Sequence, residues 1–396
     1  MPNRTIGVMG RLLDQDDGLG VYSRHILREL LALDPHSRYV IFLGSPQAQD
    51  LFQPFNNAQV HVIPAKSRLL WDQVRVPQAA RRFQVDLLFN PKFSLPLFTR
   101  IPGVFVLQSC DWYVNPRNYP WWDNLYIRLT LPLYCRKASG LLGISQATLD
   151  ELAKRVTIPV HTGVTHAGVG PNFKALGDPR ELARFRNEHA LPDRFILTVA
   201  RVLHTGHAGR PDYPGGNNER LLKAYRLYRH RARQPLPLVV AGRSVEQYLR
   251  TRGFSSADLE GVRFIGFIPN ERIHAAYQLA ECFVLATLCE SFGLPILEAL
   301  ATGCPAIVPS TGAGPEVAGS AGRLINPYDE EDIARALLEV TTSEALRNQL
   351  RQEGIRRSQA FTWRHAAEHI LEVFDELLMR CAQTAKTRRK TSPSLR

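Results

Sequence analysis

Short apolar runs alternate along this chain with stretches in which apolar residues recur at helical spacing. In the first half the runs cover residues 5–10, 39–43, 61–63, 87–89, 104–107 and 140–144. In the second half they cover residues 195–201, 238–241, 262–265, 283–286 and 305–308. Buried strands separated by helices predict a parallel sheet with helices on both faces. The two series of runs therefore predict an α/β protein with two doubly wound domains.

The length of the chain supports this division, because 396 residues exceed the size of one compact core. We expect an N-terminal domain over residues 1–172 and a second domain over residues 193–362. Residues 173–192 are charged and contain Pro179 and Pro192, which suits a connector. A helix is predicted over residues 363–381. The remaining residues, 382–396, are basic and rich in Ser and Thr, and we expect them to be disordered.

The stretch 289–300 carries the most distinctive chemistry. Glu290 and Glu298 stand eight positions apart, with Gly293 and Pro295 between them. Because Pro suits the first turn of a helix, we predict a strand, a loop carrying Glu290, and a helix that starts near Pro295 with Glu298 in its first turn. The open N–H groups of such a helix attract phosphate. Alternatively, Glu298 only complements the helix dipole and Glu290 is a solvated loop residue.

Two further places in the first half carry candidate polar groups. The first strand leads into a loop that ends Gly18-Leu19-Gly20, followed by a helical pattern. This order brings backbone N–H groups close to a phosphate, although two glycines also suit a plain turn. Ligands of parallel sheets bind beyond the carboxyl ends of the strands. Such ends carry Asn90, Gln108, Ser109 and Asp111.

The sequence from Glu290 to Ala301 resembles the Glu-x(7)-Glu signature of the retaining nucleotide-sugar glycosyltransferases of family 4, which have the GT-B fold. The similarity spans about residues 5–380, and its C-terminal half is the more specific part. Further similar stretches cover residues 18–20, 199–201, 303–305, 315–317, 326–327 and 361–363.

The resemblance implies a role for each matching residue. Glu290 contacts the donor sugar and acts as the catalytic residue by position and charge, while Glu298 holds the ribose of the nucleotide. Arg201 binds the donor diphosphate, and Gly20 lies near it. The backbone N–H groups that face the sugar belong to Phe292, Gly293 and Leu294. On the acceptor side the resemblance points to Gln108 and Asp111, and no metal ion is expected.

The chain departs from the family pattern at two positions. The segment that begins at Gln108 usually opens with histidine, and a lysine usually stands where this chain has Gly216. A positive charge beside a leaving diphosphate is worth several kcal/mol in a dry site. Either Arg210 or Arg243 replaces that lysine, or the activity is reduced. The alternative to an enzyme is therefore a non-catalytic GT-B scaffold that binds a glycan or an assembly partner.

Composition narrows the choice of partners. With 49 Lys and Arg against 37 Asp and Glu, the net charge of +12 favours phosphorylated substrates or an anionic membrane. The sequence contains no zinc-finger, RNP-like or helix-turn-helix pattern, so we expect no nucleic-acid partner. Six cysteines are scattered without a C-x-x-C pair, which indicates reduced thiols rather than a zinc site.

Residues 121–137 mix aromatic and basic side chains. One interpretation is a segment at a membrane surface, and the other is a core-facing helix that Pro132 interrupts. No apolar run is long enough to span a bilayer and no secretory segment is evident, so we expect a cytoplasmic protein. The basic tail could hold it at the inner face of the membrane.

Together, the motif and the resemblance imply a retaining glycosyltransferase. It would transfer a hexose, mannose as the first choice, to a glycan or lipid-linked acceptor in the synthesis of a cell-surface polysaccharide. GDP-mannose or a UDP-hexose would be the donor, and no cofactor is expected. A sugar phosphorylase of the same fold is a third interpretation, which phosphate dependence would distinguish.

Overall fold

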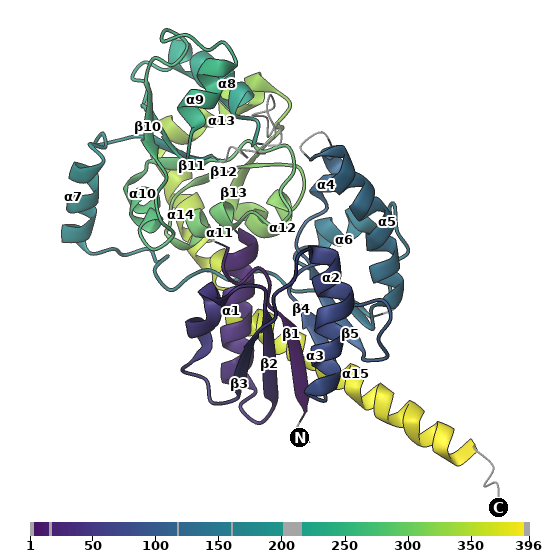
Figure 1. Cartoon of the computed structure of the whole chain (residues 1–396). Coiled ribbons are helices and arrows are strands. Elements are labelled where there is room, and N and C mark those ends of the chain that lie inside the picture. Colours follow the sequence, from purple (N-terminus) through teal and green to yellow (C-terminus); the bar gives the residue numbers. More distant parts are fainter. Residues whose placement is uncertain (1–3, 16–17, 117–118, 160, 201–215, 392–396) are drawn as a thin grey trace, which may run out of the picture. The chain divides into compact units, whose positions relative to one another are not determined.

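The computed structural model describes residues 4–391 except 16–17, 117–118, 160 and 201–215 (Figure 1). The chain divides into two units. Unit 1 comprises Met1–Cys110, Leu125–Gly168 and Thr362–Arg396, and unit 2 comprises Asp111–Asn124 and Val169–Phe361. Residues 111–124 group with unit 2, and the C-terminal segment groups with unit 1.

Unit 1 contains a seven-stranded parallel sheet in the order β3-β2-β1-β4-β5-β6-β7. Its central strands are buried, as their continuous apolar runs predicted. The strands are β1 (Thr5–Met9), β2 (Arg38–Leu43), β3 (Ala58–Val62), β4 (Leu87–Asn90), β5 (Gly103–Leu107), β6 (Gly140–Gly143) and β7 (Thr162–Val164). The short strand β7 was not predicted, because three residues give too little apolar pattern to detect.

The helices of unit 1 are α1 (Gly18–Leu33), α2 (Arg68–Leu70), α3 (Val76–Arg82), α6 (Gln146–Ala153) and α15 (Trp363–Thr391). Short 3-10 and π segments, η1 (Pro46–Phe52) and η2 (Trp71–Arg75), link some of them. Helix α5 (Trp121–Lys137) begins in the residue range of unit 2 and continues in unit 1. It runs through Pro132 without a break, so the expected interruption does not occur.

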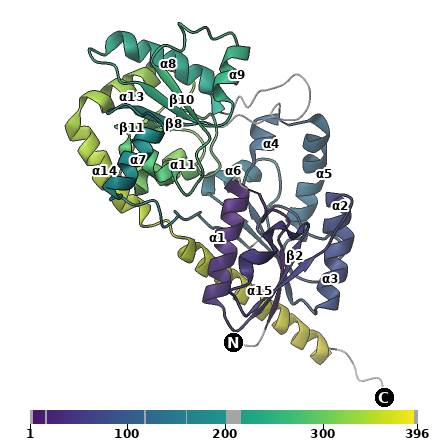
Figure 2. The same cartoon turned by 60° about the vertical axis from the view of Figure 1, so that its left-hand side comes forward.

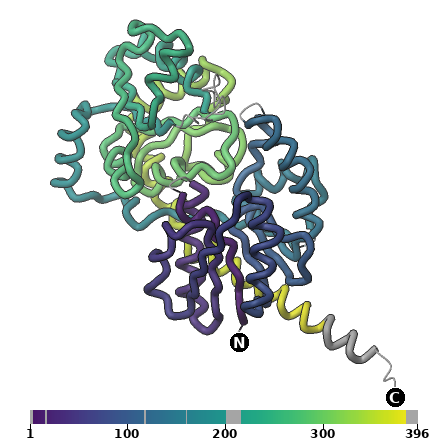
Figure 3. The backbone as a smooth tube through the Cα atoms, viewed as in Figure 1, coloured from purple at the N-terminus to yellow at the C-terminus, as the bar shows by residue number. Residues whose placement is uncertain are grey.

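Helix α15 completes unit 1 although it comes from the end of the chain (Figures 1 to 3). Phe374 packs edge-to-face on Phe89 of β4 with ring centroids 5.3 Å apart. Arg4 pairs with Asp34 at 2.9 Å and also with Asp375 of α15. The helix continues to Thr391, so residues 382–391, which we expected to be disordered, are helical. The reason is local, since no Gly or Pro interrupts the sequence between residues 363 and 391.

Unit 2 contains a six-stranded parallel sheet in the order β10-β9-β8-β11-β12-β13. The strands are β8 (Ile196–Val199), β9 (Leu238–Ala241), β10 (Val262–Gly266), β11 (Cys282–Val284), β12 (Ala306–Pro309) and β13 (Gly322–Ile325). The helices are α4 (Asp111–Val114), α7 (Pro179–Glu188), α8 (Asn218–Arg231), α9 (Val245–Thr251), α10 (Ile273–Leu279), α11 (Leu294–Ala301), α12 (Gly314–Ala318), α13 (Glu330–Thr342) and α14 (Glu344–Ser358), and a 3-10 turn, η5 (Gly319–Ala321), follows α12. Two doubly wound units confirm the predicted fold class.

The segment 173–192 is more ordered than a connector, because it contains helix α7. The side chain of Asp178 caps this helix by accepting a hydrogen bond of 2.9 Å from the N–H of Arg180. Pro179 is the first helical residue, a position that favours proline. Phe185 is buried and Glu188 pairs with Arg272, so α7 packs on unit 2. The Asp-Pro pair therefore starts a helix rather than a linker.

Candidate functional site

Each sheet reverses its order at one point, and this is where doubly wound folds bind ligands. In unit 2 the reversal lies between β8 and β11, because β9 and β10 extend the sheet on one side and β12 and β13 on the other. The loop after β11 carries Glu290 and leads into α11. In unit 1 the reversal lies between β1 and β4. The structure thus places the Glu-x(7)-Glu segment at the carboxyl end of β11, beside the reversal point of the sheet in unit 2.

The start of helix α11 follows from its sequence. Gly293 is the N-cap residue with a φ of 89°, a left-handed conformation that favours glycine. Its carbonyl oxygen accepts hydrogen bonds from the N–H groups of Ile296, at 2.9 Å, and Leu297, at 3.2 Å. The helix begins at Leu294, one residue before the predicted start. Glu298 is then the fifth helical residue, so our placement of it in the first turn is wrong.

Glu298 makes a specific contact within unit 2. The hydroxyl of Tyr277 in α10 donates a hydrogen bond of 2.9 Å to Oε2 of Glu298. Burial raises the pKa of the Glu298 carboxyl to about 7, while the hydrogen bond from Tyr277 acts in the opposite direction. Tyr277 is itself buried and packs edge-to-face on Phe173 and Phe283. Sequence reasoning missed Tyr277, since nothing in its local pattern links it to Glu298.

The backbone of Glu290 rests on the loop that follows β12. The N–H of Ala313 donates a hydrogen bond of 2.9 Å to the carbonyl oxygen of Glu290. Gly312 has a φ of 60°, and a Cβ there would come within 2.5 Å of the oxygen and 2.7 Å of the nitrogen of Glu290. Only glycine therefore lets the two loops approach so closely. Gly312 is a second supporting residue that the sequence did not reveal.

The other residues of the motif have different environments. The side chain of Phe292 is buried and packs edge-to-face on Phe361 with ring centroids 5.9 Å apart. The prediction for Phe292 concerns its backbone N–H and not this side chain. Leu294 is partly buried at the first position of α11. The donor-binding roles of Phe292, Gly293 and Leu294 stay predictions.

Asn217, next to the unusual Gly216, joins three parts of unit 2. Its backbone is left-handed, with a φ of 53°. Its side-chain amide donates hydrogen bonds of 2.7 Å to the carbonyl oxygens of Ala286, after β11, and Pro327, after β13. Gly216 is therefore held at the same edge of the sheet as the Glu290 loop. The sequence gave no signal for these bonds, which span 69 and 110 positions.

Of the cations considered for the diphosphate, Arg201 and Arg210 lie outside the described residues. Arg243 follows β9 and stacks over the ring of Phe267 at 5.1 Å. Arg220 donates a hydrogen bond of 2.7 Å to Oδ1 of Asn217, so it is a further cation beside Gly216. Arg220 was not among the residues that the sequence suggested.

The predicted residues outside the motif are engaged within their own units. A Cβ at Gly20 would overlap the carbonyl oxygen of Gln15, so glycine lets the loop lie against α1. Gln108 is buried and donates a hydrogen bond to the carbonyl oxygen of Pro91. In unit 2, Asp111 accepts hydrogen bonds from the side chains of Asn115, at 2.6 Å, and Tyr119, at 3.0 Å. The proposed roles of Gly20, Gln108 and Asp111 are not tested by these contacts.

Unit 1 has a charged cluster near its own reversal point, which sequence reasoning missed. Asp72 is almost fully buried, and burial raises the pKa of its carboxyl group. Arg68 lies 3.7 Å from this carboxylate, and the charges of Arg11 and Lys92 also act on it. The cluster is therefore cationic overall and suits an anionic or hydroxyl-rich ligand group.

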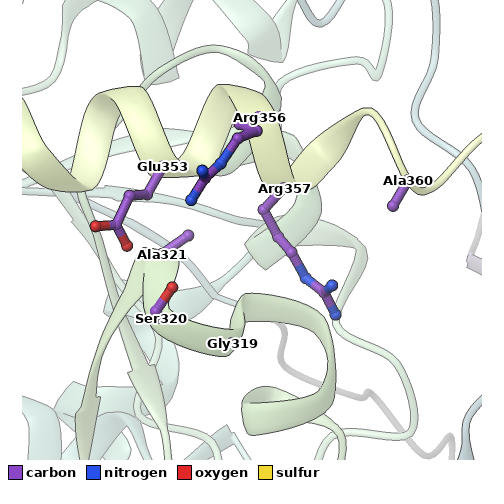
Figure 4. Close-up of a pocket in the computed structure, with 7 residues that line it drawn as sticks. All are labelled: Gly319, Ser320, Ala321, Glu353, Arg356, Arg357 and Ala360. Atoms are coloured by element: carbon purple, nitrogen blue, oxygen red, sulfur yellow. The ribbon is translucent and has the colours of Figure 1, made fainter.

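A separate hollow of about 390 Å³ lies on unit 2 between η5 and α14 (Figure 4). Arg357 on its wall donates hydrogen bonds to the carbonyl oxygens of Glu316, at 2.6 Å, and Val317, at 3.1 Å, at the end of α12. Among the residues that the structure describes, no predicted donor residue lines this hollow. The hollow is lined by Gly319, Ser320, Ala321, Glu353, Arg356, Arg357 and Ala360.

The described residues contain neither a cluster of metal ligands nor a helix suited to a membrane. Within the described ranges, no three or more His, Cys, Asp and Glu side chains are grouped so that they could hold a metal ion. Among the helices that the structure describes, none combines the length and apolarity needed to cross a bilayer.

Comparison with known proteins gives the family context of this site. Residues 180–357 match the family described as "Glycosyl transferases group 1". The serotype-specific mannosyltransferase WbdA of Escherichia coli is 28% identical over 254 residues, which is 63% of this chain but only 30% of WbdA. The O-antigen chain mannosyltransferase B of Escherichia coli is 29% identical over 377 residues and is covered to 95%, with 90% of this chain aligned.

Solved structures show the same architecture. HepE of Anabaena, solved with UDP and glucose, superposes with a TM-score of 0.72 at 16% identity, covering 94% of this chain and all of HepE. WaaG, a glycosyltransferase involved in lipopolysaccharide biosynthesis, superposes with a TM-score of 0.68 at 15% identity, covering 93% of this chain and 99% of WaaG. At these identities the likeness concerns the fold. The part of the chain that carries the motif therefore matches the group 1 glycosyltransferases, the chain is similar along its length to a mannosyltransferase, and its two units have the GT-B architecture.

Proposed function

We propose that this protein is a retaining mannosyltransferase that transfers mannose from a nucleotide-diphosphate sugar to a glycan or lipid-linked acceptor in cell-surface polysaccharide synthesis. The observation that carries the proposal is the position of the Glu-x(7)-Glu segment at the reversal point of unit 2. Mannose is favoured because both Escherichia coli relatives are named mannosyltransferases. GDP-mannose is the first choice of donor, and a UDP-hexose is the second.

In this proposal each residue acts on a defined part of the donor. The carboxylate of Glu298, steadied by Tyr277, accepts hydrogen bonds from the ribose hydroxyls. Glu290, held through its backbone by Ala313, accepts them from hydroxyls of the sugar. The first N–H groups of α11 face the diphosphate, which a helix N-terminus stabilises. Of the cations nearby, Arg220 is hydrogen-bonded to Asn217, which follows Gly216, the position at which the family pattern has lysine.

The reaction breaks the bond between the anomeric carbon and the diphosphate oxygen, and forms one between that carbon and an acceptor hydroxyl oxygen. The leaving diphosphate takes the proton of the hydroxyl on the same face of the sugar, so the configuration is retained. Glu290 therefore works by position and charge rather than as a nucleophile. We place the reaction in the cytoplasm, at the inner face of the membrane when the acceptor is lipid-linked.

A second candidate is a GT-B scaffold that binds a glycan or an assembly partner without turnover. Gly216 in place of lysine favours it. So does Gln108, because its amide is buried and already donates to the carbonyl oxygen of Pro91. At both positions the family pattern has a side chain that a conventional enzyme would use, namely lysine at position 216 and histidine at position 108.

A thermal-shift screen against GDP, UDP, TDP and ADP and their sugar conjugates tests the choice. A ligand that binds only the folded state raises the melting temperature by mass action. We expect GDP and GDP-mannose to respond, and turnover of GDP-mannose with a mannan or lipid-linked acceptor to follow. A response without turnover on any acceptor would favour the scaffold. No response to any nucleotide at millimolar concentration would overturn the proposed donor site.

A further inference from the structure

Helix α5 is apolar on two faces, which is unusual for a helix at the surface of a globular protein. One face is buried in the protein through Ile127, Leu131, Tyr134 and Cys135. The other face carries Leu125, Leu129 and Leu133 at intervals of four residues, and these side chains are 48%, 62% and 45% exposed. The exposed leucines therefore form a continuous row along the helix. The core-facing interpretation of this segment explains only the first of the two faces.

A neighbouring segment carries further exposed apolar side chains. The guanidinium of Arg68 in α2 lies over the ring of Tyr126 in α5, 5.2 Å from its centroid, so the two helices are adjacent in unit 1 (Figures 1 and 2). Residues on α2 and η2 add three exposed apolar side chains, Leu69, Leu70 and Val74. We call these three residues and the three leucines of α5 the α2–α5 surface. Trp121, which is 71% exposed, and Trp122 begin α5.

The charges of the same segments indicate what the surface binds. Residues 66–75 and 121–137 contain six basic and only two acidic residues, and one of the two acids, Asp72, is buried. Arg128 and Arg136 are exposed on α5 itself. Leucine rows flanked by arginine, with tryptophan at one end, are typical of helices that lie in the interface of an anionic bilayer. The excess of positive charge adds attraction to its lipid phosphates.

We propose that the α2–α5 surface docks on an anionic lipid bilayer, with the leucine row buried at the headgroup boundary and Arg128 and Arg136 on lipid phosphates. The proposal goes beyond sugar transfer and does not depend on the identity of donor or acceptor. It assigns membrane contact to unit 1 and thereby favours one of the two interpretations of residues 121–137 that the sequence left open, rather than the basic C-terminal end.

Flotation of the full chain with vesicles tests whether the exposed leucines contribute to membrane binding. The vesicles are phosphatidylcholine alone or phosphatidylcholine with about one third phosphatidylglycerol, and contain no sugar nucleotide or glycan. We expect binding to the anionic vesicles, and a roughly tenfold lower partition coefficient for the double variant Leu125→Gln, Leu129→Gln. The matched control is Leu176→Gln, Met379→Gln, because these side chains are 85% and 60% exposed elsewhere. It should change binding less than about twofold. Equal losses in the two variants would overturn the proposal.

Separate variants test whether the arginines of α5 contribute to membrane binding. Arg128→Gln with Arg136→Gln should lower binding to the anionic vesicles about 30-fold, since each basic residue near the surface contributes about 1 kcal/mol. The exposed pair Arg233→Gln with Arg263→Gln is the control. If removal of residues 383–396 abolishes binding while the α5 variants bind normally, the C-terminal end is the contact and the proposal is wrong.

Tryptophan fluorescence gives a readout that needs no disruptive variant. Brominated lipids should quench the wild-type emission, and Trp121→Phe with Trp122→Phe should remove most of that quenching. A chain that dimerises without vesicles, and becomes monomeric in the leucine variant, would show instead that the α2–α5 surface is a protein interface.

Discussion

The hydroxyl of Tyr277 donates a hydrogen bond of 2.9 Å to Oε2 of Glu298, across 21 positions of the chain. Burial raises the pKa of the Glu298 carboxyl to about 7. The ionised form is the stronger acceptor for ribose hydroxyls, so we expect nucleotide affinity to rise between about pH 6 and pH 8. The ionised form is also the costlier one to bury. The folded state therefore loses stability as the pH rises from 4.5, the usual value, towards 7.

The variant Tyr277→Phe tests this relationship. Loss of the hydroxyl removes the hydrogen bond that lowers the pKa of Glu298, so the rise in nucleotide affinity should move to higher pH by up to about one unit. Isothermal titration of GDP at several pH values measures the shift. Glu298→Gln, which does not titrate, supplies the baseline for the ionisation of the nucleotide itself. A Tyr277→Phe profile identical to that of the wild type would show that Tyr277 is only a packing residue.

Replacing Glu290 should mainly lower turnover, whereas replacing Glu298 should mainly weaken nucleotide binding. Glu290→Ala removes a group that acts on the sugar in the transition state, so kcat should fall by about 100-fold or more with nucleotide affinity nearly unchanged. Glu298→Ala should mainly weaken nucleotide binding, by roughly tenfold. Turnover assays and GDP titrations on both variants give the comparison. Equal effects on turnover and affinity in both variants would refute the division of roles.

Replacing Gly312 should lower turnover more than replacing another glycine whose φ is also positive. Gly312→Ala brings a Cβ against the backbone of Glu290, so we expect a shifted Glu290 and at least about tenfold lower turnover. Gly253 also has a positive φ, of 87°, but a Cβ there would meet nothing within 4 Å. Gly253→Ala should therefore cost about 1 kcal/mol of stability and leave turnover unchanged. Similar turnover in the two variants would remove the argument for Gly312.

Asn217 should contribute to the stability of unit 2. Its amide satisfies the carbonyl oxygens of Ala286 and Pro327, so Asn217→Gly should lower the free energy of unfolding by about 1–3 kcal/mol. Asn217→Ala should cost about 1 kcal/mol more, because alanine is strained at a φ of 53°. Denaturant unfolding of the two variants separates the amide from the backbone effect. A stable Asn217→Gly variant would mean that other donors reach these oxygens.

Gly216 remains the departure most relevant to activity. It precedes Asn217, whose side chain bonds to the carbonyl oxygen of Pro327 after β13 and accepts a hydrogen bond from Arg220. If Arg220 serves the diphosphate, Arg220→Gln should weaken GDP binding by about tenfold or more and Arg243→Gln should not. GDP titration of both variants measures this. The reverse order would assign the role to Arg243.

Much of the fold could be predicted from the sequence because its signals are local. The buried strands β1, β4, β5 and β9 appear as continuous apolar runs, and the parallel doubly wound class follows from their alternation with helices. The loop between β11 and α11 could also be predicted from a local signal, because Gly293 and Pro295 indicate a helix start. The resemblance to a family rests mainly on this stretch, because its distinctive residues follow one another closely in the sequence.

Other features required the tertiary structure, because they depend on which strands become neighbours. Arg4 and Asp375 are 371 positions apart, yet they join α15 to unit 1. The segment with α7 looked like a linker because its prolines are ambiguous until the capping by Asp178 is seen. The exposure of Leu129 likewise follows from packing, since its sequence context suits a core helix equally well.

The sequence by itself therefore determined the fold class and the resemblance to a family, and it singled out the two glutamates as candidates. Only the tertiary structure decided what supports them: Tyr277 on Glu298, Gly312 beneath Glu290, and Asn217 between the ends of β11 and β13. Hydrophobic periodicity records whether a residue faces a core, but it carries no information about its partner there. That partner is set by the order of the strands, which brings distant loops to one edge of a sheet.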